Sequence, residues 1–217
     1  GFARDLQFSL VSTSDAGCTL VLEANQETRR LFPFEFKLFA TYLLKNSTLT
    51  VGYRVENHSD GTMWFSLGAH PGFNCPLFAG ERYEDYFLEF DDTTYHLTAL
   101  DKGLRTDTLT VLQLDQRQLP LSTAVFDEDA LVFEGGQISG LRLCSRTKGP
   151  LVQLNCPGWP FFGIWSKKGC DQFVCLEPWF GVADHTYSRG ELAEKTGITA
   201  LLPGHHFEAS YSIAILR

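Results

Sequence analysis

The stretch Thr48–Asn57, "TLTVGYRVEN", alternates apolar residues with polar or small ones. Leu49, Val51, Tyr53 and Val55 would share one side of an extended chain, because successive side chains of a strand point to opposite faces of a sheet. One face would then pack on a core and the other would meet solvent, which is typical of an antiparallel sheet. The stretch therefore predicts a half-buried β-strand.

Similar runs of β-branched, aromatic and leucine residues recur on both sides of this strand. They read "LQFSLVS", "CTLVLEA", "FEFKLFATYLL", "YFLEF", "TLTVLQL", "GLRLCSR", "LVQLN", "FVCLEP" and "ASYSIAIL". Turn-forming stretches such as "KNST", "HSDG", "EGGQ", "TKGP" and "SKKG" separate them. The pattern predicts an all-β antiparallel sandwich or barrel.

Helical signals are nearly absent. In "SRGELAEKTG", Ser188 stands three residues before Glu191 as in a capping box, and Gly197 would end the helix. The sequence thus predicts at most one short helix, of two turns at most.

Length and composition indicate one folded domain over residues 1–217. The chain is 44% hydrophobic and 13% aromatic, enough to bury a sizeable core, and it has no internal repeat or linker. No apolar run reaches the ~18 residues of a membrane-spanning helix. The chain starts with Gly1 instead of methionine, so we expect an N-terminal segment to be missing.

Charge and motif content exclude several kinds of partner. The net charge of −8 argues against binding to nucleic acid or to anionic membranes, because both would repel the protein. No CxxC, HExxH, GxGxxG or GxxxxGK[ST] motif is present, so no metal or nucleotide cofactor is predicted. The six separate cysteines indicate reduced thiols in a cytoplasmic protein, with a disulfide set as the alternative.

A histidine is the first candidate for chemistry. In "SLGAHPGFN", two glycines and a proline bend the chain, which would place His70 at a rim with Asn74 beside it. A histidine held in a turn or in the core is the structural alternative. Asn74 is a candidate substrate-binding residue.

Carboxylates interrupt two apolar runs. Asp129 lies in "VFDEDALVFEGG", where the acidic residues could equally form a solvated turn. Glu177 follows Val174-Cys175-Leu176 in a run apolar enough for a central strand. A carboxylate in such a strand is costly unless it is paired or functional.

Aromatic residues cluster in "PGWPFFGIWS", as a core or as a binding platform. A site that moves protons on a carbohydrate needs proton-transfer groups and flat apolar surfaces. This sequence offers a histidine, carboxylates on other strands and flat aromatic faces.

These motifs resemble the aldose 1-epimerase (galactose mutarotase-like) family, in particular its LacX-like bacterial branch. The resemblance runs over essentially the whole chain, in order, through "GFARD", "FPFEFKLFATYLL", "LTVGYRVEN", "MWFSLGAHPGFNCPL", "FDEDALVFEG", "FGIWSKKG", "FVCLEPWFGVAD", "EKTGITALLPG" and "FEASYSIAI". Members of this branch have some tens of residues before "GFARD".

The resemblance implies a large antiparallel β-sandwich that interconverts the α and β anomers of an aldose, either free or phosphorylated. A base takes the proton of the anomeric hydroxyl while an acid protonates the ring oxygen, the ring opens, and it closes on the other face. Two positioned proton-transfer groups suffice, so no metal or organic cofactor is implied. The oligomeric state stays open.

Individual roles also follow from the resemblance. His70 matches the family's general acid, and Arg4 of "GFARD" matches the sugar-binding arginine, whose forked donors can hold two hydroxyls. Asp129 and Trp165 fall at positions that look like substrate-site residues. Glu177 matches a characteristic family glutamate, either in contact with sugar or supporting the site.

The C-terminal pattern departs from the family. In the family, the general base is usually the glutamate right after Pro-Gly. In this chain that position, in "LPGHHFE", is His205. Either His205 replaces the base, or Glu177 or Glu208 takes over, or the protein is a non-catalytic carbohydrate-binding protein on the same scaffold. An accessory domain of a glycoside hydrolase or lyase is a third, weaker alternative.

Overall fold

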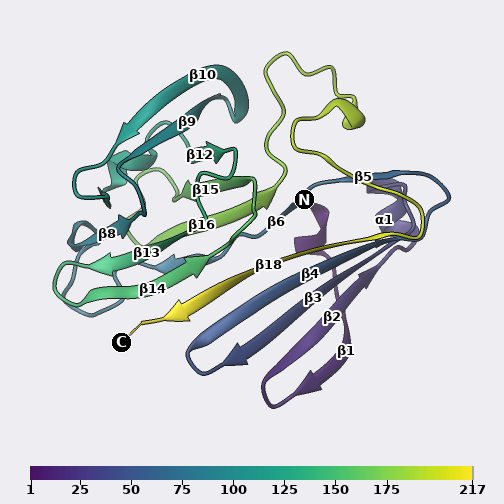
Figure 1. The fold of residues 1–217 in the computed structure, drawn as a ribbon, viewed down its shortest axis with the longest axis horizontal. Coiled ribbons are helices and arrows are strands. Elements are labelled where there is room, and N and C mark those ends of the chain that lie inside the picture. Colours follow the sequence, from purple (N-terminus) through teal and green to yellow (C-terminus); the bar gives the residue numbers. More distant parts are fainter. Residues whose placement is uncertain (217) are drawn as a thin grey trace. The chain divides into compact units, whose positions relative to one another are not determined.

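The computed structural model describes residues 1–216 and forms two compact units (Figure 1). The first comprises Gly1–Phe65 and Thr199–Ile213, and the second comprises Ser66–Ile198 together with the chain from Ala214 onward. The prediction of a single domain stays a prediction.

The first unit is built on an antiparallel sheet of order β1-β2-β3-β4-β18. Its strands are β1 (Ser9–Ser14), β2 (Gly17–Glu23), β3 (Phe36–Lys45), β4 (Thr48–Asn57) and β18 (His206–Ile215), and the short strands β5 (Met63–Phe65) and β17 (Thr199–Leu201) pair separately. The alternation predicted for β4 is confirmed, since Val51 and Val55 are buried and Arg54 is exposed.

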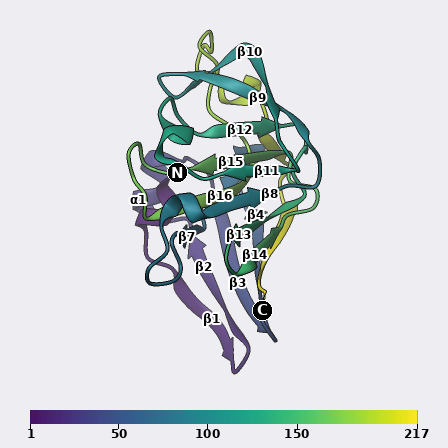
Figure 2. The ribbon, with the colours of Figure 1, turned by 90° about the vertical axis from the view of Figure 1, so that its left-hand side faces the viewer.

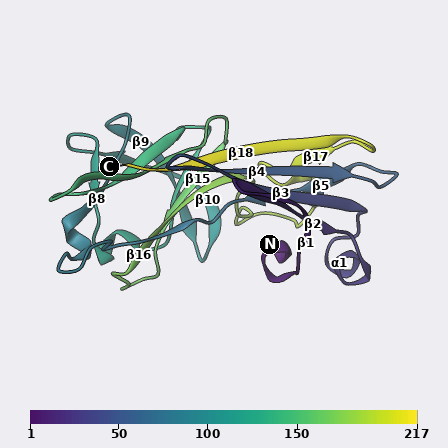
Figure 3. The same ribbon diagram turned by 90° about the horizontal axis from the view of Figure 1, so that it is seen from below.

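Two short helical segments lie on one side of this sheet, η1 (Phe2–Asp5) and α1 (Gln26–Leu31) (Figure 3). Asn25 caps α1 by accepting the N–H groups of Glu27 and Thr28, and the Thr28 hydroxyl accepts the Asn25 N–H in return. Asn25 and Thr28 thus form a capping box. The helix α1 begins at this point because its first N–H groups find acceptors there.

The second unit contains two runs of antiparallel strands. One has the order β14-β13-β8-β11, and the other has the order β10-β9-β12-β15-β16-β6 with β7 also paired to β16 (Figure 2). Their bounds are β6 Leu67–Gly68, β7 Gly72–Asn74, β8 Tyr86–Glu89, β9 Thr94–Asp101, β10 Leu104–Gln113, β11 Gln118–Pro120, β12 Leu131–Glu134, β13 Gly140–Ser145, β14 Gly149–Asn155, β15 Phe161–Trp165 and β16 Phe173–Phe180.

Among the described residues of the second unit, helical structure is limited to three 3-10 turns, η2 (Tyr83–Asp85), η3 (Thr123–Phe126) and η4 (Leu192–Glu194). The helix suggested for residues 188–197 is therefore reduced to η4, and the α-helix in the part of the chain that the structure describes is α1 instead. None of the helices among residues 1–216 is long and apolar enough to cross a membrane.

The core of the second unit is aromatic. Trp159, Tyr83, Phe90, Phe133 and Phe162 are among its largest fully buried side chains. None of the six cysteines takes part in a disulfide, and four of them are buried. The predicted all-β antiparallel architecture is confirmed.

Candidate active site

His70 lies in the linker between β6 and β7, which stays hydrogen-bonded to β16 on both sides of the histidine. The Ala69 N–H donates to the Pro178 carbonyl at 3.0 Å, and the Leu176 N–H donates to the Pro71 carbonyl at 3.1 Å. The side chain of His70 is 57% exposed. The main chain therefore fixes the position of this residue and leaves its imidazole open to solvent.

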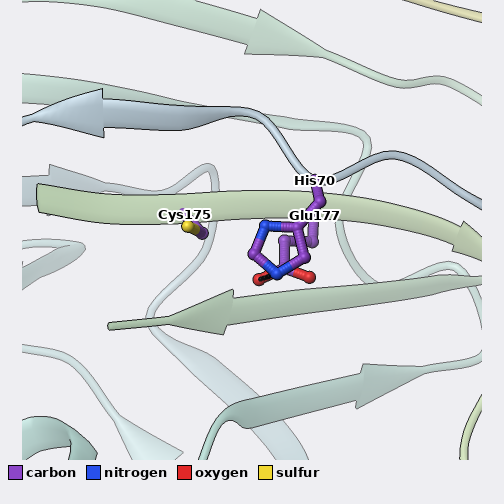
Figure 4. A group of neighbouring side chains, drawn as sticks. All are labelled: His70, Cys175 and Glu177. Carbon is purple, nitrogen blue, oxygen red and sulfur yellow. Dashed lines mark ion pairs between the residues drawn. The ribbon is translucent and has the colours of Figure 1, made fainter. Parts of the chain in front are cut away.

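Glu177 lies in the middle of β16 with only 4% of the residue exposed. The imidazole lies across its carboxyl group (Figure 4), with His70 Nε2 3.3 Å from Glu177 Oε1. Oε1 is buried and has no hydrogen-bond partner among the described residues. Burial raises the pKa of Glu177 to about 8, against a hydrogen bond from Trp179 that lowers it. The neutral acid is thus the favoured form at pH 7.

Trp179 shares the face of β16 with Glu177, two residues along the strand. Its indole lies over the backbone of two glycines on the neighbouring strands: a Cβ at Gly163 would come within 2.2 Å of the ring, and one at Gly68 within 2.8 Å. Gly163 is also the register partner of Glu177, and Gly68 that of Trp179. The two glycines therefore make the room in which the indole reaches the carboxyl group.

Trp165 lies across from Cys175 at the end of β15. Its ring meets the imidazole of His70 edge-on, with centroids 5.8 Å apart and an interplanar angle of 80°. The other aromatic residues of "PGWPFFGIWS" belong to the core, namely Trp159, Phe161 and Phe162. Trp165 alone of this cluster is thus available to border a ligand beside His70.

Cys175 lies beside His70 and Glu177. Its sulfur, a ring nitrogen of His70 and a carboxylate oxygen of Glu177 all lie within 4.8 Å of one another. Burial, with a smaller contribution from Glu177, raises the pKa of this thiol to about 12. Sequence reasoning missed both Cys175 and Trp179, although the two-residue alternation of "CLEPW" places them on the face of Glu177.

Asp129 and Asn74 lie near the same end of the sheet, and among the described residues neither forms a hydrogen bond or an ion pair with His70. Asp129 lies two residues before β12, where Leu131 pairs with Ile164, the neighbour of Trp165. Its Oδ1 accepts the N–H of Ala130 at 2.7 Å. Asn74 is exposed at the end of β7. Their substrate-binding roles stay predictions.

Arg4 belongs to the first unit. It lies in η1 with a side chain that is 79% exposed, and its Nε is 3.4 Å from Asp5 Oδ2. Phe2 anchors this segment through ring contact with Phe32, with centroids 5.7 Å apart. The arginine is therefore presented from a fixed backbone with its donors largely free for a ligand.

His205 also belongs to the first unit, in the turn between β17 and β18. The buried Asn57 at the end of β4 holds this turn: its N–H donates to the His205 carbonyl at 3.1 Å, and its carbonyl accepts the Gly204 N–H at 2.9 Å. Its side-chain amide donates to the Leu201 carbonyl at 2.7 Å. His205 is exposed on an ordered turn, and its role as a base stays a prediction.

Comparison with known proteins gives concordant matches. The sequence model of the aldose 1-epimerase family matches residues 1–198. The chain is 30% identical to the chromosomal protein LacX of Lactococcus lactis over 224 aligned residues, which cover all of this chain and 74% of LacX.

Solved structures show the same fold. A galactose mutarotase related enzyme from Lactobacillus acidophilus is 34% identical, with a TM-score of 0.93 over the whole of this chain and 73% of its own. A galactose mutarotase-like protein from Lactobacillus casei is 28% identical, with a TM-score of 0.88 over the whole of this chain and 75% of its own. The galactose mutarotase-like fold expected from the motifs is thereby confirmed.

Proposed function

Because this chain belongs to the aldose 1-epimerase family, we propose that it is an isomerase that interconverts the α and β anomers of an aldose. The observation that carries this proposal is the pairing of an exposed imidazole with a buried carboxyl group. His70 can reach a ligand from the solvent side, and Glu177 lies 3.3 Å behind it.

The proposed reaction begins with two proton transfers. The imidazolium of His70 gives its proton to the ring oxygen, while a base takes the proton of the anomeric hydroxyl. The C1–O5 bond breaks, its electron pair stays on the ring oxygen, and C1 becomes an aldehyde carbon. After rotation about the C1–C2 bond, the 5-hydroxyl attacks the other face of the aldehyde and the protons return.

The surroundings of His70 support this role. Glu177 can exchange a proton with the imidazole across their short separation, so His70 can be restored between turnovers. Trp165 stands edge-on beside the imidazole and offers an apolar surface to the C–H groups of a sugar. Placed acid and base groups of this kind contribute roughly 10²- to 10⁴-fold each.

The remaining parts of the proposal come from the family pattern. His205 occupies the place of the general base, and Arg4, Asn74 and Asp129 would bind sugar hydroxyls. The side chains described around His70 are Trp165, Cys175, Glu177 and Trp179, and none of them is a lysine or an arginine. A phosphate group would need such cationic partners, so an unphosphorylated aldose is favoured over a sugar phosphate.

A carbohydrate-binding protein without turnover is the second candidate. It is favoured by one observation, the histidine at position 205 where the family usually has a glutamate. In that case the sugar would bind beside Trp165, and anomer exchange would not exceed the rate in buffer.

Anomer exchange measured by NMR tests the proposal, with glucose, galactose and hexose 6-phosphates as substrates. His70→Ala should lower turnover by about 10²- to 10⁴-fold because the ring oxygen loses its proton donor. His58→Ala is the matched control, since His58 is also an exposed histidine beside a glutamate, 2.9 Å from Glu56.

The control should keep full activity. Unchanged turnover in His70→Ala would refute the assignment of the acid. Sugar binding without any exchange in the wild-type protein would favour the second candidate.

A further inference from the structure

Three side chains with different ligand chemistry converge on one face of β16. We propose that His70, Cys175 and Glu177 bind a zinc-class divalent cation, and that the bound ion inhibits the proposed reaction. An imidazole nitrogen, a thiol sulfur and a carboxylate oxygen lie within 4.8 Å of one another there (Figure 4).

The buried oxygen of Glu177 is the second observation that points to a ligand. Oε1 has no hydrogen-bond partner among residues 1–216, and the side chain is only 5% exposed. Buried polar atoms nearly always accept a hydrogen bond, and this one has only the 3.3 Å ion-pair contact with His70 Nε2, so it calls for an explanation. A cation between this oxygen and His70 Nε2 would supply the missing interaction.

The ligand set selects among metals. Imidazole, thiolate and carboxylate are the three ligand types that proteins offer to Zn²⁺, and a soft thiolate disfavours Mg²⁺ and Ca²⁺. Three protein ligands leave a fourth position of a tetrahedral ion open to water or to a sugar hydroxyl.

The geometry requires only a small adjustment. Zinc–ligand bonds of about 2.0–2.3 Å place two ligand atoms of one tetrahedral ion roughly 3.3–3.8 Å apart. The three atoms, which lie within 4.8 Å of one another, must therefore close by about 1.5 Å at most. Cys175 and Glu177 are buried neighbours on one strand, whereas the side chain of His70 is more than half exposed and can move toward them.

Binding would block the proposed chemistry without any change of oxidation state. The thiol and carboxyl protons pass to solvent as the ion binds. The His70 nitrogen and the Glu177 oxygen are then occupied by metal and unable to exchange protons. The inhibition rests on the proposed function, whereas the metal site itself does not.

Binding is measured on the whole chain after removal of metals with EDTA, by titration with Co²⁺ and Zn²⁺. We expect one ion per chain and a thiolate-to-Co²⁺ charge-transfer absorption. Cys175→Ser should lose this absorption, and His70→Ala should weaken affinity at least about 10-fold, since even indirect partners of a metal contribute that much. Cys170→Ser is the matched control, because Cys170 is a more accessible thiol in the same unit.

Anomer exchange is then measured with and without Zn²⁺. Zinc should inhibit the wild-type protein and Cys170→Ser, and EDTA should restore both. The exchange rate of Cys175→Ser should be the same with and without Zn²⁺, whatever its basal value.

The proposal would be overturned if Cys175→Ser and His70→Ala both bound zinc as tightly as the wild type does. It would also be overturned if the wild-type protein did not bind zinc. A wild-type protein that binds zinc at these residues and has no exchange activity would refute the proposed function and leave the metal site standing.

Discussion

Glu177 is tolerated in a central strand because its surroundings favour the uncharged form. Burial raises its pKa to about 8, so at neutral pH the fold does not have to hold a full negative charge among apolar neighbours. The same burial keeps a proton on the carboxyl group of Glu177, 3.3 Å from the nitrogen of His70 that can accept it. At this residue, stability and chemistry depend on one desolvated carboxyl group.

His205 carries the sharpest prediction at the scale of a single residue. His205→Glu should raise turnover by about 10-fold or more, because it restores a carboxylate at the position of the family's base. The backbone hydrogen bonds of Asn57 to this turn do not involve the side chain at 205, so the substitution should leave the turn in place. Anomer exchange is the measurement.

The neighbouring His206→Glu is the control for this experiment. It adds a carboxylate beside Glu208 without filling the position that follows Pro-Gly. If only the control variant gains activity, or if neither does, the base lies elsewhere in the protein.

At the scale of elements, β15 and β16 depend on a glycine. Gly163→Ala should lower the melting temperature by several degrees, since a Cβ would lie 2.2 Å from the indole of Trp179 and overpacking costs about 1–3 kcal/mol. Turnover should fall as well, because the displaced indole would lose its hydrogen bond to Glu177. Thermal unfolding and anomer exchange check the two parts.

Gly52→Ala is a matched control in another strand. There the nearest atom to an added Cβ is 4.0 Å away, in ordinary contact with Thr41. Alanine should be tolerated or slightly stabilising. Equal effects of the two substitutions would contradict the packing explanation for Gly163.

Glu81 connects β8 with the end of β13. Its carboxylate accepts hydrogen bonds from the hydroxyl groups of Thr147, Tyr86 and Ser145. The bond from Thr147, followed by that from Tyr86, lowers the pKa of Glu81 below its usual value. Because the pKa is lower in the folded state, this carboxylate stabilises the fold above its unfolded pKa, and the contribution is lost as pH falls through the folded pKa.

Glu81→Gln should therefore lower the melting temperature at pH 7, and the difference from the wild type should shrink as the pH drops below about 4. Thermal unfolding from pH 7 to pH 3 measures this. Glu84→Gln, at an exposed position in η2, should change little at any pH. A difference for Glu81→Gln that does not vary with pH would show that its charge is not involved.

At the scale of the whole molecule, local patterns predicted the strands well. Each of the ten apolar runs overlaps a strand, because the two-residue alternation is a local property of the sequence. The family resemblance drawn from the motifs is confirmed as well. The helix over 188–197 had a capping signal but Leu192 stays exposed, and so short a helix needs packing of an apolar face to persist.

The site could be predicted only in part. His70 and Glu177 each stood out alone, but their contact depends on the pairing of β7 with β16, which joins distant segments through Gly72 and Cys175. Nothing local in the sequence encodes that register. Trp179 and Cys175 were missed for the same reason, since their importance comes from the neighbours that the sheet gives them.

The two main-chain hydrogen bonds beside His70 have a consequence for how such a protein can evolve. The backbone at position 70 is held by Pro178 and Leu176, so its place above β16 does not depend on the side chain that it carries. A single substitution there exchanges the reactive group and leaves the scaffold intact. A lineage with this fold can therefore lose, regain or replace its chemistry faster than it can change its architecture.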